Sequence, residues 1–405
     1  MIKKIFIILP YKESLDKNFA GAVSIYAKDM TKFSKYKKEI KIISSDDSEK
    51  NKLFKNKNYI LDFCKKYEKT KIDIIEIHNR PEYLSYIKKY FPKTKIILFF
   101  HNNPLTMGYS ITINEREFII DNTDKIIFMS NWIQQKFYSG LKNIDISKSQ
   151  IIYPGVEKIK KNNFNKKEKI ILFVGKLNYA KGYNIFCEVA HMFKKHNPSW
   201  NFIAIGDEIR KKIFPKKNTV IELGYLNNDK VLKYYQRSEI AIGNSVWDEP
   251  LGRIAIEASS RKCLPIISNK AGLSESKKIA HVLKDNTPLE IYNYLKKITS
   301  NNKLRHNKQN LFYKNNAFDI RILSNKLDTV RKNLLLLSNK KKKSKNKKIL
   351  HVANFNENSD GRLYYSFANK LDPGIILKTF DDKFNCEDFN VKINYDYHSS
   401  LSKNP

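Results

Sequence analysis

The chain has 405 residues, of which 41% are apolar and 29% charged. This length suggests roughly two or three domains, and the apolar fraction is enough to build real cores, which excludes a wholly disordered chain. The formal net charge of +35 favours phosphate-bearing or anionic partners. Only 10 of the 76 cations are Arg, however, and 66 are Lys. Because nucleic-acid readers depend on the bidentate Arg guanidinium, the charge alone identifies no function.

The cysteines and the apolar runs indicate the compartment. Cys64, Cys187, Cys263 and Cys386 are far apart, with no metal-ligand spacing, which predicts free buried thiols in a reducing compartment. The N-terminal apolar run Ile5–Leu9 is shorter than a signal-peptide core and predicts a buried strand instead. No other run approaches the roughly 20 residues that cross a bilayer. We expect a cytoplasmic protein, either soluble or peripheral at the cytoplasmic face of the inner membrane.

Two series of short β-branched runs alternate with amphipathic stretches. In the first series the predicted strands are Ile5–Leu9, Ile40–Ser44, Asp73–Ile77, Lys95–Phe100 and Lys125–Met129, and the predicted helices are 21–35, 51–68, 81–90 and 130–138. In the second series the predicted strands are Ile170–Val174, Asn201–Ile205, Thr219–Leu223, Glu239–Gly243 and Leu264–Ser268. Such alternation is typical of α/β folds with parallel sheets covered on both faces. It predicts two doubly wound, Rossmann-like domains, 1–160 and 161–337.

The end of the chain is organised differently. The stretch 317–337 predicts a helix that closes the second series and that can cross back to the first domain. Residues 338–348 contain a Lys-rich run that predicts a solvated, flexible linker. Residues 349–405 are too few for another doubly wound domain. There we expect a partial strand–helix extension, such as the start of a truncated second module, with a strand at Ile349–Phe355, a turn at Asp360-Gly361 and a helix over 362–371.

Glycine is scarce, so its placement is informative. Eight of the 13 glycines lie within one 118-residue stretch, several of them directly after predicted strands: Gly155, Gly175, Gly182, Gly206, Gly224, Gly243, Gly252 and Gly272. Glycine after a parallel strand lets the backbone approach a ligand at the carboxyl edge of the sheet. Any one of these is explained by an ordinary turn, but the cluster favours a ligand site.

The stretch from Asp248 to Ala258 carries the sharpest local signal. Pro250 fits the first position of a helix, which places Glu249 in the preceding loop and Glu257 about two turns inside. The amides of Leu251, Gly252 and Arg253 would then form a helix N-terminus suited to a phosphate group. Acidic side chains beside a phosphate suit the hydroxyls of ribose and sugar.

A second element runs from Phe173 to Gly182 as a strand, a loop and a helix start. Its two lysines, Lys176 and Lys181, lie five residues apart. Two ammonium groups at such a junction can neutralise a diphosphate leaving group. A lysine pair is weak support in a chain this rich in Lys, and it becomes specific in combination with Glu249 and Glu257.

These motifs together resemble the retaining nucleotide-sugar glycosyltransferases of the GT-B fold, family 4. The resemblance rests on the E-x7-E pattern of Glu249 and Glu257, Gly-Lys-Leu…Lys-Gly at 175–182, Tyr-Pro-Gly-Val-Glu at 153–157 and Gly-Asp at 206–207. It runs in order from about residue 1 to 337. It implies an acceptor-side first domain, a second domain that binds the nucleotide sugar, and a reaction in the cleft between them.

The resemblance also implies roles for individual residues. The expected catalytic residues are Glu249, His101 and Lys181, and the expected acceptor-side residues are His78 and Asn79. The expected donor-binding residues are Gly21, Gly175, Lys176, Lys181, Gly182, Tyr225, Leu251, Gly252, Arg253 and Glu257. The sequence departs from the family at Lys176, where Arg is usual, and at Ala20, Lys262 and Ala271, where Gly is common, while Glu275 is retained. We expect these departures to bear on donor preference and rate more than on the reaction class.

The expected reaction moves a sugar from a nucleotide diphosphate sugar to an acceptor hydroxyl with retention, on a carbohydrate or lipid-linked acceptor of surface polysaccharide, lipopolysaccharide or glycolipid synthesis. No cofactor or metal is implied, and no Asp-x-Asp is present in the sequence. We expect peripheral contact with an anionic membrane and no specific nucleic-acid partner. Two alternatives stay open: a basic, non-catalytic nucleic-acid-binding protein, and a GT-B epimerase or phosphorylase.

Overall fold

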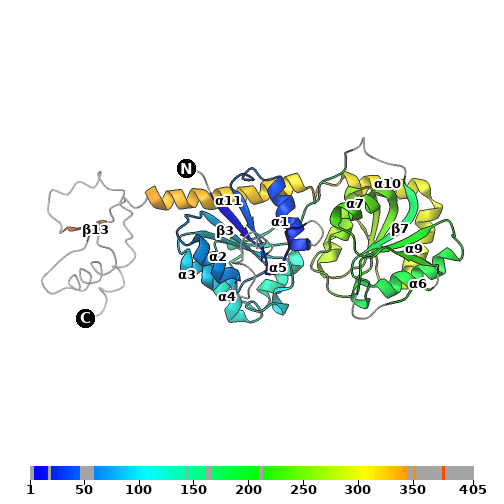
Figure 1. Ribbon diagram of the computed structural model, residues 1–405, viewed down its shortest axis with the longest axis horizontal. Helices are drawn as coiled ribbons and strands as arrows, with labels where there is room; N and C mark the ends of the chain where they lie inside the picture. The colour runs from blue at the N-terminus through cyan, green and yellow to red at the C-terminus, as the bar shows by residue number, and fades with distance from the viewer. Residues whose placement is uncertain are drawn as a thin grey trace, which may run out of the picture. The chain divides into compact units, whose positions relative to one another are not determined.

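A computed structural model describes residues 4–16, 20–45, 59–142, 145–160, 167–208, 213–216, 218–343, 350–352 and 376–378. By their contacts, residues 1–335 form one compact unit and residues 336–405 a second. The first unit contains two six-stranded sheets, each with its own helices (Figure 1). All the strand pairs that the two sheets contain are parallel. The expected α/β architecture of two doubly wound domains is confirmed.

The first sheet has the strand order β2-β1-β3-β4-β5-β6. Its strands are β1 (Ile5–Ile8), β2 (Ile40–Ile43), β3 (Ile74–His78), β4 (Lys95–Phe100), β5 (Lys125–Phe128) and β6 (Ser149–Ile151). The helices are α1 (Ala22–Lys32), α2 (Tyr59–Tyr67), α3 (Tyr83–Tyr90), α4 (Ile113–Asn122) and α5 (Asn131–Tyr138). The chain order reverses between β1 and β3, and ligands of open α/β sheets bind at such a switch point.

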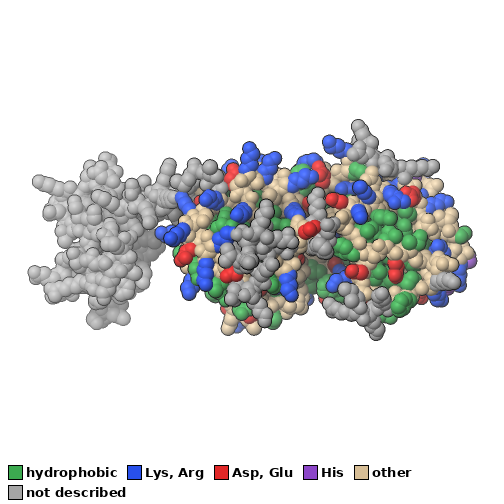
Figure 2. Space-filling view, viewed as in Figure 1, with side chains coloured by type: hydrophobic (Ala, Val, Ile, Leu, Met, Phe, Trp, Pro, Cys, Tyr) green, Lys and Arg blue, Asp and Glu red, His purple; other side chains and the backbone are tan. Residues whose placement is uncertain are grey.

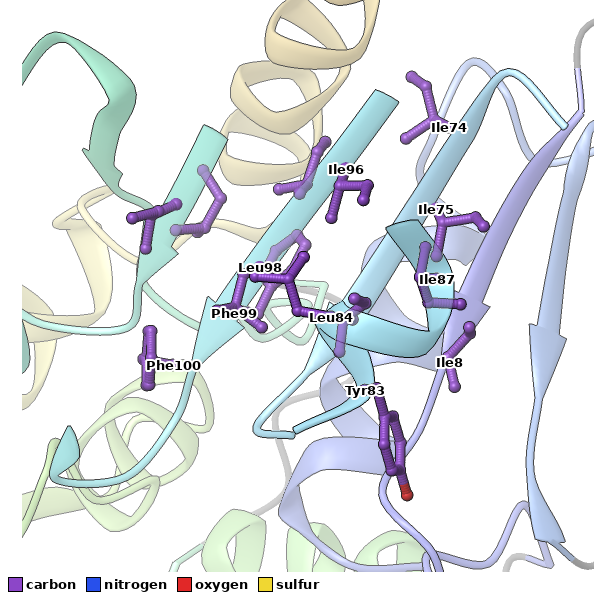
Figure 3. Packing of buried hydrophobic residues seen from close by; sticks show 14 of the residues in the cluster. Ile8, Ile74, Ile75, Tyr83, Leu84, Ile87, Ile96, Leu98, Phe99 and Phe100 are labelled. Atoms are coloured by element: carbon purple, nitrogen blue, oxygen red, sulfur yellow. The ribbon is translucent and has the colours of Figure 1, made fainter. Parts of the chain in front are cut away.

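Apolar side chains from the central strands and α3 form the core of this domain. Figure 3 shows Leu84 and Ile87 of α3 lying over the residues of β3 and β4, which include Ile75, Ile96 and Leu98. All of these side chains are buried. The near-continuous apolar strands are the pattern of a sheet covered on both faces, which explains why their positions could be predicted.

Two elements of the first domain have no counterpart among the predicted ones. α4 lacks a clear apolar stripe, since its Ile113 and Phe118 are exposed and its Arg116 is buried. Its start is fixed instead by a capping box, in which Thr112 and Glu115 bond to each other's backbone amides. β6 has only three residues and no fully buried side chain. Neither element has the hydrophobic periodicity by which helices and strands are predicted.

The second sheet has the strand order β12-β11-β10-β7-β8-β9, with its reversal between β7 and β10. Its strands are β7 (Glu168–Val174), β8 (Asn201–Ile205), β9 (Val220–Glu222), β10 (Ser238–Gly243), β11 (Leu264–Ile267) and β12 (His281–Val282). The helices are α6 (Tyr183–Lys194), α7 (Asn228–Arg237), α8 (Ile254–Ser260), α9 (Pro288–Ser300) and α10 (Asn302–Lys314). Along β7, Ile171 and Phe173 belong to the core with α6 and α9, whereas Ile170 and Leu172 belong to the core with α7. This alternation of side chains covers both faces of the sheet.

The long helix α11 (Ile320–Lys343) packs on the first domain (Figure 1). Leu323, Leu327 and Val330 lie in the core of that domain, and Arg331 forms a bidentate ion pair with Glu76 of β3. The helix continues through Lys343, so the start of the stretch 338–348 is helical and the expectation of a flexible linker was wrong there. The apolar stripe that predicted the helix ends before the Lys run, while helical backbone continues into it.

Several other predictions concern boundaries and the tail. The helix predicted over 51–68 is described only as α2, and the strand predicted at Ile349–Phe355 is present as β13 (Leu350–Val352), which pairs in parallel with β14 (Ile376–Lys378). The predicted turn at Asp360-Gly361 and the predicted helix 362–371 lie outside the described residues.

Surface and thiol features complete the description. Lys and Arg side chains are scattered over the visible face of residues 4–335 rather than gathered in one patch (Figure 2). Cys64, Cys187 and Cys263 are free and buried, as expected, and Cys386 lies outside the described residues. No helix in the described ranges is long and apolar enough to span a bilayer.

Candidate active site

A cavity of about 140 Å³ lies at the carboxyl ends of β7 and β10, which are neighbours at the switch point of the second sheet. This is where ligands of open α/β folds bind. The cavity is lined by Phe173, Val174, Gly175, Lys181, Tyr235, Gly243, Ser245, Glu249, Gly252, Arg253, Ile254, Glu257 and Leu273. Six of the residues predicted to bind donor or to act in catalysis are therefore brought together: Gly175, Lys181, Glu249, Gly252, Arg253 and Glu257.

Gly182 lets two loops of this site meet. It precedes α6 with φ of 74°, in the left-handed region that favours glycine. A Cβ atom at this position would lie 2.1 Å from the carbonyl oxygen of Asn244, the residue after β10. Asn244 Nδ2 in turn donates to the Gly182 carbonyl oxygen at 2.7 Å. The absence of a side chain at Gly182 thus allows the Lys181 loop to lie directly against the loop that carries Glu249.

Lys181 and Glu249 form an ion pair within the cavity lining. Lys181 Nζ lies 2.7 and 2.6 Å from the two carboxylate oxygens of Glu249. Glu249 Oε2 also accepts hydrogen bonds from Trp247 Nε1 at 2.6 Å and Ser245 Oγ at 3.2 Å. Lys181 Nζ lies over the Trp247 ring, 5.0 Å from its centroid. The side chains of Lys181 and Glu249 are partly exposed, so a ligand can reach both charges.

Glu257 belongs to the same lining and is 4% exposed. Its Oε1 accepts from Arg253 Nε at 2.8 Å and from Asn228 Nδ2 at 3.0 Å. Arg253 also approaches Asp29 of α1, with 3.6 Å between NH2 and Oδ2, and its NH1 is buried without a partner. Burial raises the pKa of Asp29, although the Arg253 charge opposes that rise. The lining thus contains two cations and two carboxylates, with one guanidinium nitrogen free to bind.

The start of the helix at Glu257 differs from the prediction. α8 begins at Ile254 rather than at Pro250, and it has seven residues, so Glu257 lies in its first turn. Gly252 has φ of 75°, which helical backbone does not allow, and this explains the later start. Leu251 is buried, and Gly252 and Arg253 precede the helix. The helix therefore starts later than predicted, with Arg253 as its N-cap, and of the residues 251–253 only Arg253 belongs to its N-terminus.

Five predicted donor-binding residues are not among the lining residues: Gly182 and Leu251, described above, and Lys176, Tyr225 and Gly21. Lys176 is exposed and is not among the lining residues. Tyr225 is 54% exposed and follows Gly224 at the end of the β8–β9 region. Gly21 precedes α1 in the first domain, where a Cβ atom would lie 2.7 Å from the Glu13 carboxylate. The structure therefore groups Lys181, and not Lys176, with the two glutamates.

The predicted residues of the first domain meet at the ends of β3 and β4. His78 Nδ1 lies 2.9 Å from His101 Nε2. Asn79 Oδ1 accepts from the backbone amides of His101 at 3.1 Å and Asn102 at 3.3 Å, which fixes the loop after β4. His78 is 1% exposed, so its side chain has a buried position instead of the expected acceptor-facing one. Burial lowers the pKa of His101 to about 3, and both rings are neutral at physiological pH.

The sequence reasoning missed four residues that shape the site. Ser245 and Trp247 hold Glu249, Asn228 binds Glu257, and Asp29 approaches Arg253 from the first domain. Ser245 and Trp247 stand just before the E-x7-E pattern, so their proximity was a usable signal. Asn228 and Asp29 are distant from this pattern in the sequence, and no sequence signal pointed to them.

Glu275 adds a further contact between the two sheets' domains. Its carboxylate accepts from the backbone amides of Asn131 at 2.9 Å and Trp132 at 2.7 Å, which start α5, and from Tyr153 Oη at 2.9 Å. Nearby, Ser130 Oγ donates to the Pro250 carbonyl oxygen at 2.6 Å. A carboxylate at a helix N-terminus is stabilising. Among the described residues no group of three or more His, Cys, Asp or Glu side chains could hold a metal ion.

A family model described as "Glycosyl transferases group 1" matches residues 156–314, the part of the chain that contains the cavity. Spore coat protein SA of Bacillus subtilis is 24% identical over 313 residues, which cover 67% of this chain and 82% of that protein. The putative glycosyltransferase YtcC of the same organism is 24% identical over 50% of this chain and 57% of its own length.

Solved structures share the architecture. The crystal structure of Anabaena HepE in complex with UDP has a TM-score of 0.62 and 13% identity, and the match covers 82% of this chain and 100% of that one. At this identity the likeness shows the fold, which is GT-B: two doubly wound domains with a site on the second sheet. The group 1 domain and the glycosyltransferase relatives indicate that the reaction is glycosyl transfer. The chain is a GT-B glycosyltransferase, a transferase of the EC 2.4 class.

Proposed function

We propose that the protein is a retaining glycosyltransferase of the family 4 type, which moves a sugar from a nucleoside diphosphate donor to an acceptor hydroxyl. The observation that carries this proposal is the meeting of Lys181, Glu249, Arg253 and Glu257 around one cavity at the switch point of the second sheet. Cations beside hydroxyl-binding carboxylates suit a nucleoside diphosphate sugar, whose diphosphate is anionic and whose ribose and sugar carry hydroxyls. The UDP-bound HepE structure supports a donor of this kind.

The chain's own residues take the following roles in this proposal. Lys181 exchanges its contact with Glu249 for the diphosphate, and the free NH1 of Arg253 adds a second cation. Glu257, held by Arg253 and Asn228, accepts from the ribose hydroxyls. Glu249, still held by Ser245 and Trp247, then accepts from a donor-sugar hydroxyl. His101 contributes from the first domain, and Lys176 and Tyr225 stay peripheral contacts.

The reaction breaks the bond between the anomeric carbon and the diphosphate oxygen and forms a bond from the acceptor oxygen to the same face of that carbon. The electron pair of the broken bond stays with the diphosphate, whose charge Lys181 and Arg253 stabilise. The acceptor proton passes to an oxygen of the departing diphosphate. No protein nucleophile, metal or other cofactor is required in this scheme.

The acceptor follows from the class of enzyme rather than from a described pocket. We propose a carbohydrate or lipid-linked hydroxyl in surface polysaccharide, lipopolysaccharide or glycolipid synthesis, with the enzyme in the cytoplasm or at the cytoplasmic face of the inner membrane. α3 is consistent with contact to an anionic membrane, because Tyr86 is 42% exposed and Lys88 and Lys89 lie in its last turn.

The test begins with donor binding. A panel of UDP, GDP and ADP sugars is scored by thermal shift, because a ligand of the folded state raises the unfolding temperature by mass action. The stabilising donor is then incubated with candidate acceptors. Release of nucleoside diphosphate only in the presence of an acceptor, with retained anomeric configuration in the NMR spectrum of the product, is the expected result. Acceptor-independent release with an altered free sugar would indicate the epimerase alternative instead.

A further inference from the structure

The histidines of the first domain form an isolated pair whose hydrogen bond can be assigned. The His78 ring is held by stacking on Phe99, with centroids 4.2 Å apart and an interplanar angle of 8°. In that orientation its Nδ1 faces His101 Nε2 at 2.9 Å, and its Nε2 is buried without a partner. Tyr26 packs edge-on against His101, with centroids 5.1 Å apart. These contacts hold both imidazole planes, and the short Nδ1–Nε2 distance selects the orientation of each ring within its plane.

Both rings carry one proton each. Burial lowers the pKa of His78 well below its ordinary value, and the Arg331 charge, like any proton added to His101, lowers it further. Burial also lowers the pKa of His101 to about 3. Arg331 is itself fully buried and paired with Glu76, two residues before His78 on β3. The pair therefore shares two N–H groups among four ring nitrogens at neutral pH.

The position of the second N–H decides between two arrangements. If His101 donated to His78, the remaining proton of His78 would sit on its buried Nε2, and a donor would be orphaned. If His78 donates to His101, the buried Nε2 is a bare lone pair and the second N–H is on His101 Nδ1. Orphaned buried N–H groups are rarer in proteins than under-satisfied acceptors. His101 is partly exposed, and its Nδ1 is not among the buried partnerless atoms.

We infer that His78 is a positioning residue, whose Nδ1–H donates to His101 Nε2 and thereby fixes His101 as the tautomer protonated at Nδ1. The functional part of this inference rests on the proposed function. Because its Nε2 lone pair is occupied, the other ring nitrogen of His101 is an N–H. It then acts as a hydrogen-bond donor to an oxygen of the bound sugar and not as a base. Second residues behind a functional histidine commonly set its tautomer in this way.

The tautomer is tested directly by long-range ¹H–¹⁵N NMR of the full chain labelled with ¹⁵N-histidine. His101→Asn identifies the His101 signals, and His196, which is exposed, provides the reference for a solvated ring. Two substitutions are compared. His78→Asn keeps an amide donor where Nδ1 stands, whereas His78→Leu removes the donor. We expect His101 to be protonated at Nδ1 in the unmodified protein and in His78→Asn, and to relax toward the His196 pattern in His78→Leu.

Kinetics give the second readout. His78→Leu is expected to lower kcat by about 10- to 100-fold with little change in donor KM, and His78→Asn to restore most of the loss. Thermal unfolding checks that both variants fold. His101 protonated at Nε2, or an unchanged tautomer in a folded His78→Leu variant, would overturn the inference. If no donor supports transfer, the proposed function fails, and the NMR result still decides the tautomer.

Discussion

Lys181 Nζ contacts both carboxylate oxygens of Glu249, at 2.7 and 2.6 Å, although the two residues lie in loops that follow different strands. The contact joins the two sequence motifs that predicted the site. Under the proposed function, the donor diphosphate competes with Glu249 for the three N–H groups of the Lys181 ammonium.

Lys181→Met should lower kcat by about 10²- to 10³-fold, because it removes a preorganised charge from the departing diphosphate. Lys176→Met is expected to cost less than about tenfold, since Lys176 is exposed and lies outside the cavity lining. Lys169→Met is the matched control, because Lys169 lies on β7 outside the cavity lining and donates to Ser199 Oγ from an exposed position. Steady-state kinetics on the three variants rank the lysines. Equal losses of kcat in Lys176→Met and Lys181→Met would instead support the sequence-based prediction that both lysines bind the diphosphate.

The buried ion pair between Arg331 and Glu76 gives a prediction about stability. Both side chains are 0% exposed, and the guanidinium donates through Nε and NH2 at 2.6 and 2.8 Å. Arg331→Met leaves Glu76 buried and unpaired, so the free energy of unfolding should fall by about 3–5 kcal/mol. Arg237→Met removes a bidentate pair with Glu168 that is about half exposed, and should cost about 0–1 kcal/mol.

Urea unfolding of both variants measures the difference. A loss at Arg331 no larger than that at Arg237 would contradict the assignment of Arg331 as the residue that anchors α11 to the first domain. The double variant with Glu76→Leu should recover part of the loss, because the unpaired Glu76 charge is then gone, whereas the buried Asp328, which also pairs with Arg331, keeps its charge.

Most strands of the two six-stranded sheets could be predicted from the sequence, whereas most of the site geometry could not. The strands are continuous apolar runs, and the motif residues stand next to them, so β4 and β8 have the bounds that the sequence predicts. Gly252 shows the limit: its positive φ delays α8 until Ile254, and the pattern of a Pro-initiated helix gave no sign of it. Contacts such as Asp29 with Arg253 join positions far apart in the chain, and one sequence contains no signal for them.

Gly182 and Gly224 make a matched pair for testing close packing at the site. Both have left-handed φ values, 74° and 68°. A Cβ at Gly182 would lie 2.1 Å from the Asn244 carbonyl oxygen, whereas nothing lies within 4 Å of a Cβ at Gly224. Gly224→Ala should therefore cost only the backbone strain, about 1–2 kcal/mol. Gly182→Ala should cost more and should also weaken donor binding, because it separates Lys181 from Glu249. Thermal unfolding measures the loss of stability and titration measures donor affinity. Equal losses of stability in Gly182→Ala and Gly224→Ala would show that the loops carrying Lys181 and Glu249 can move apart at no cost.

The contribution of Glu275 to stability can be measured separately from its effect on the reaction. Its carboxylate lies at the N-terminus of α5, where it accepts from the amides of Asn131 and Trp132. Glu275→Gln keeps an acceptor but removes the charge, and should lower the free energy of unfolding by about 0.3–1 kcal/mol. Glu275→Ala also removes the acceptor of Tyr153 Oη and should lower the free energy of unfolding by about 1–3 kcal/mol.

Because Glu275 does not line the cavity, donor affinity should change little in either variant. If His101 of the first domain acts on a donor held by the second, as proposed, transfer should fall, because Glu275 bonds the two domains together. Isothermal titration with the donor and a transfer assay on the same preparation separate the two quantities. Glu115→Ala in the exposed capping box of α4 is the control, because it weakens a helix start of the first domain without touching the second. A Glu275→Ala enzyme that binds donor normally and also transfers at the full rate would show that this contact is dispensable for the reaction.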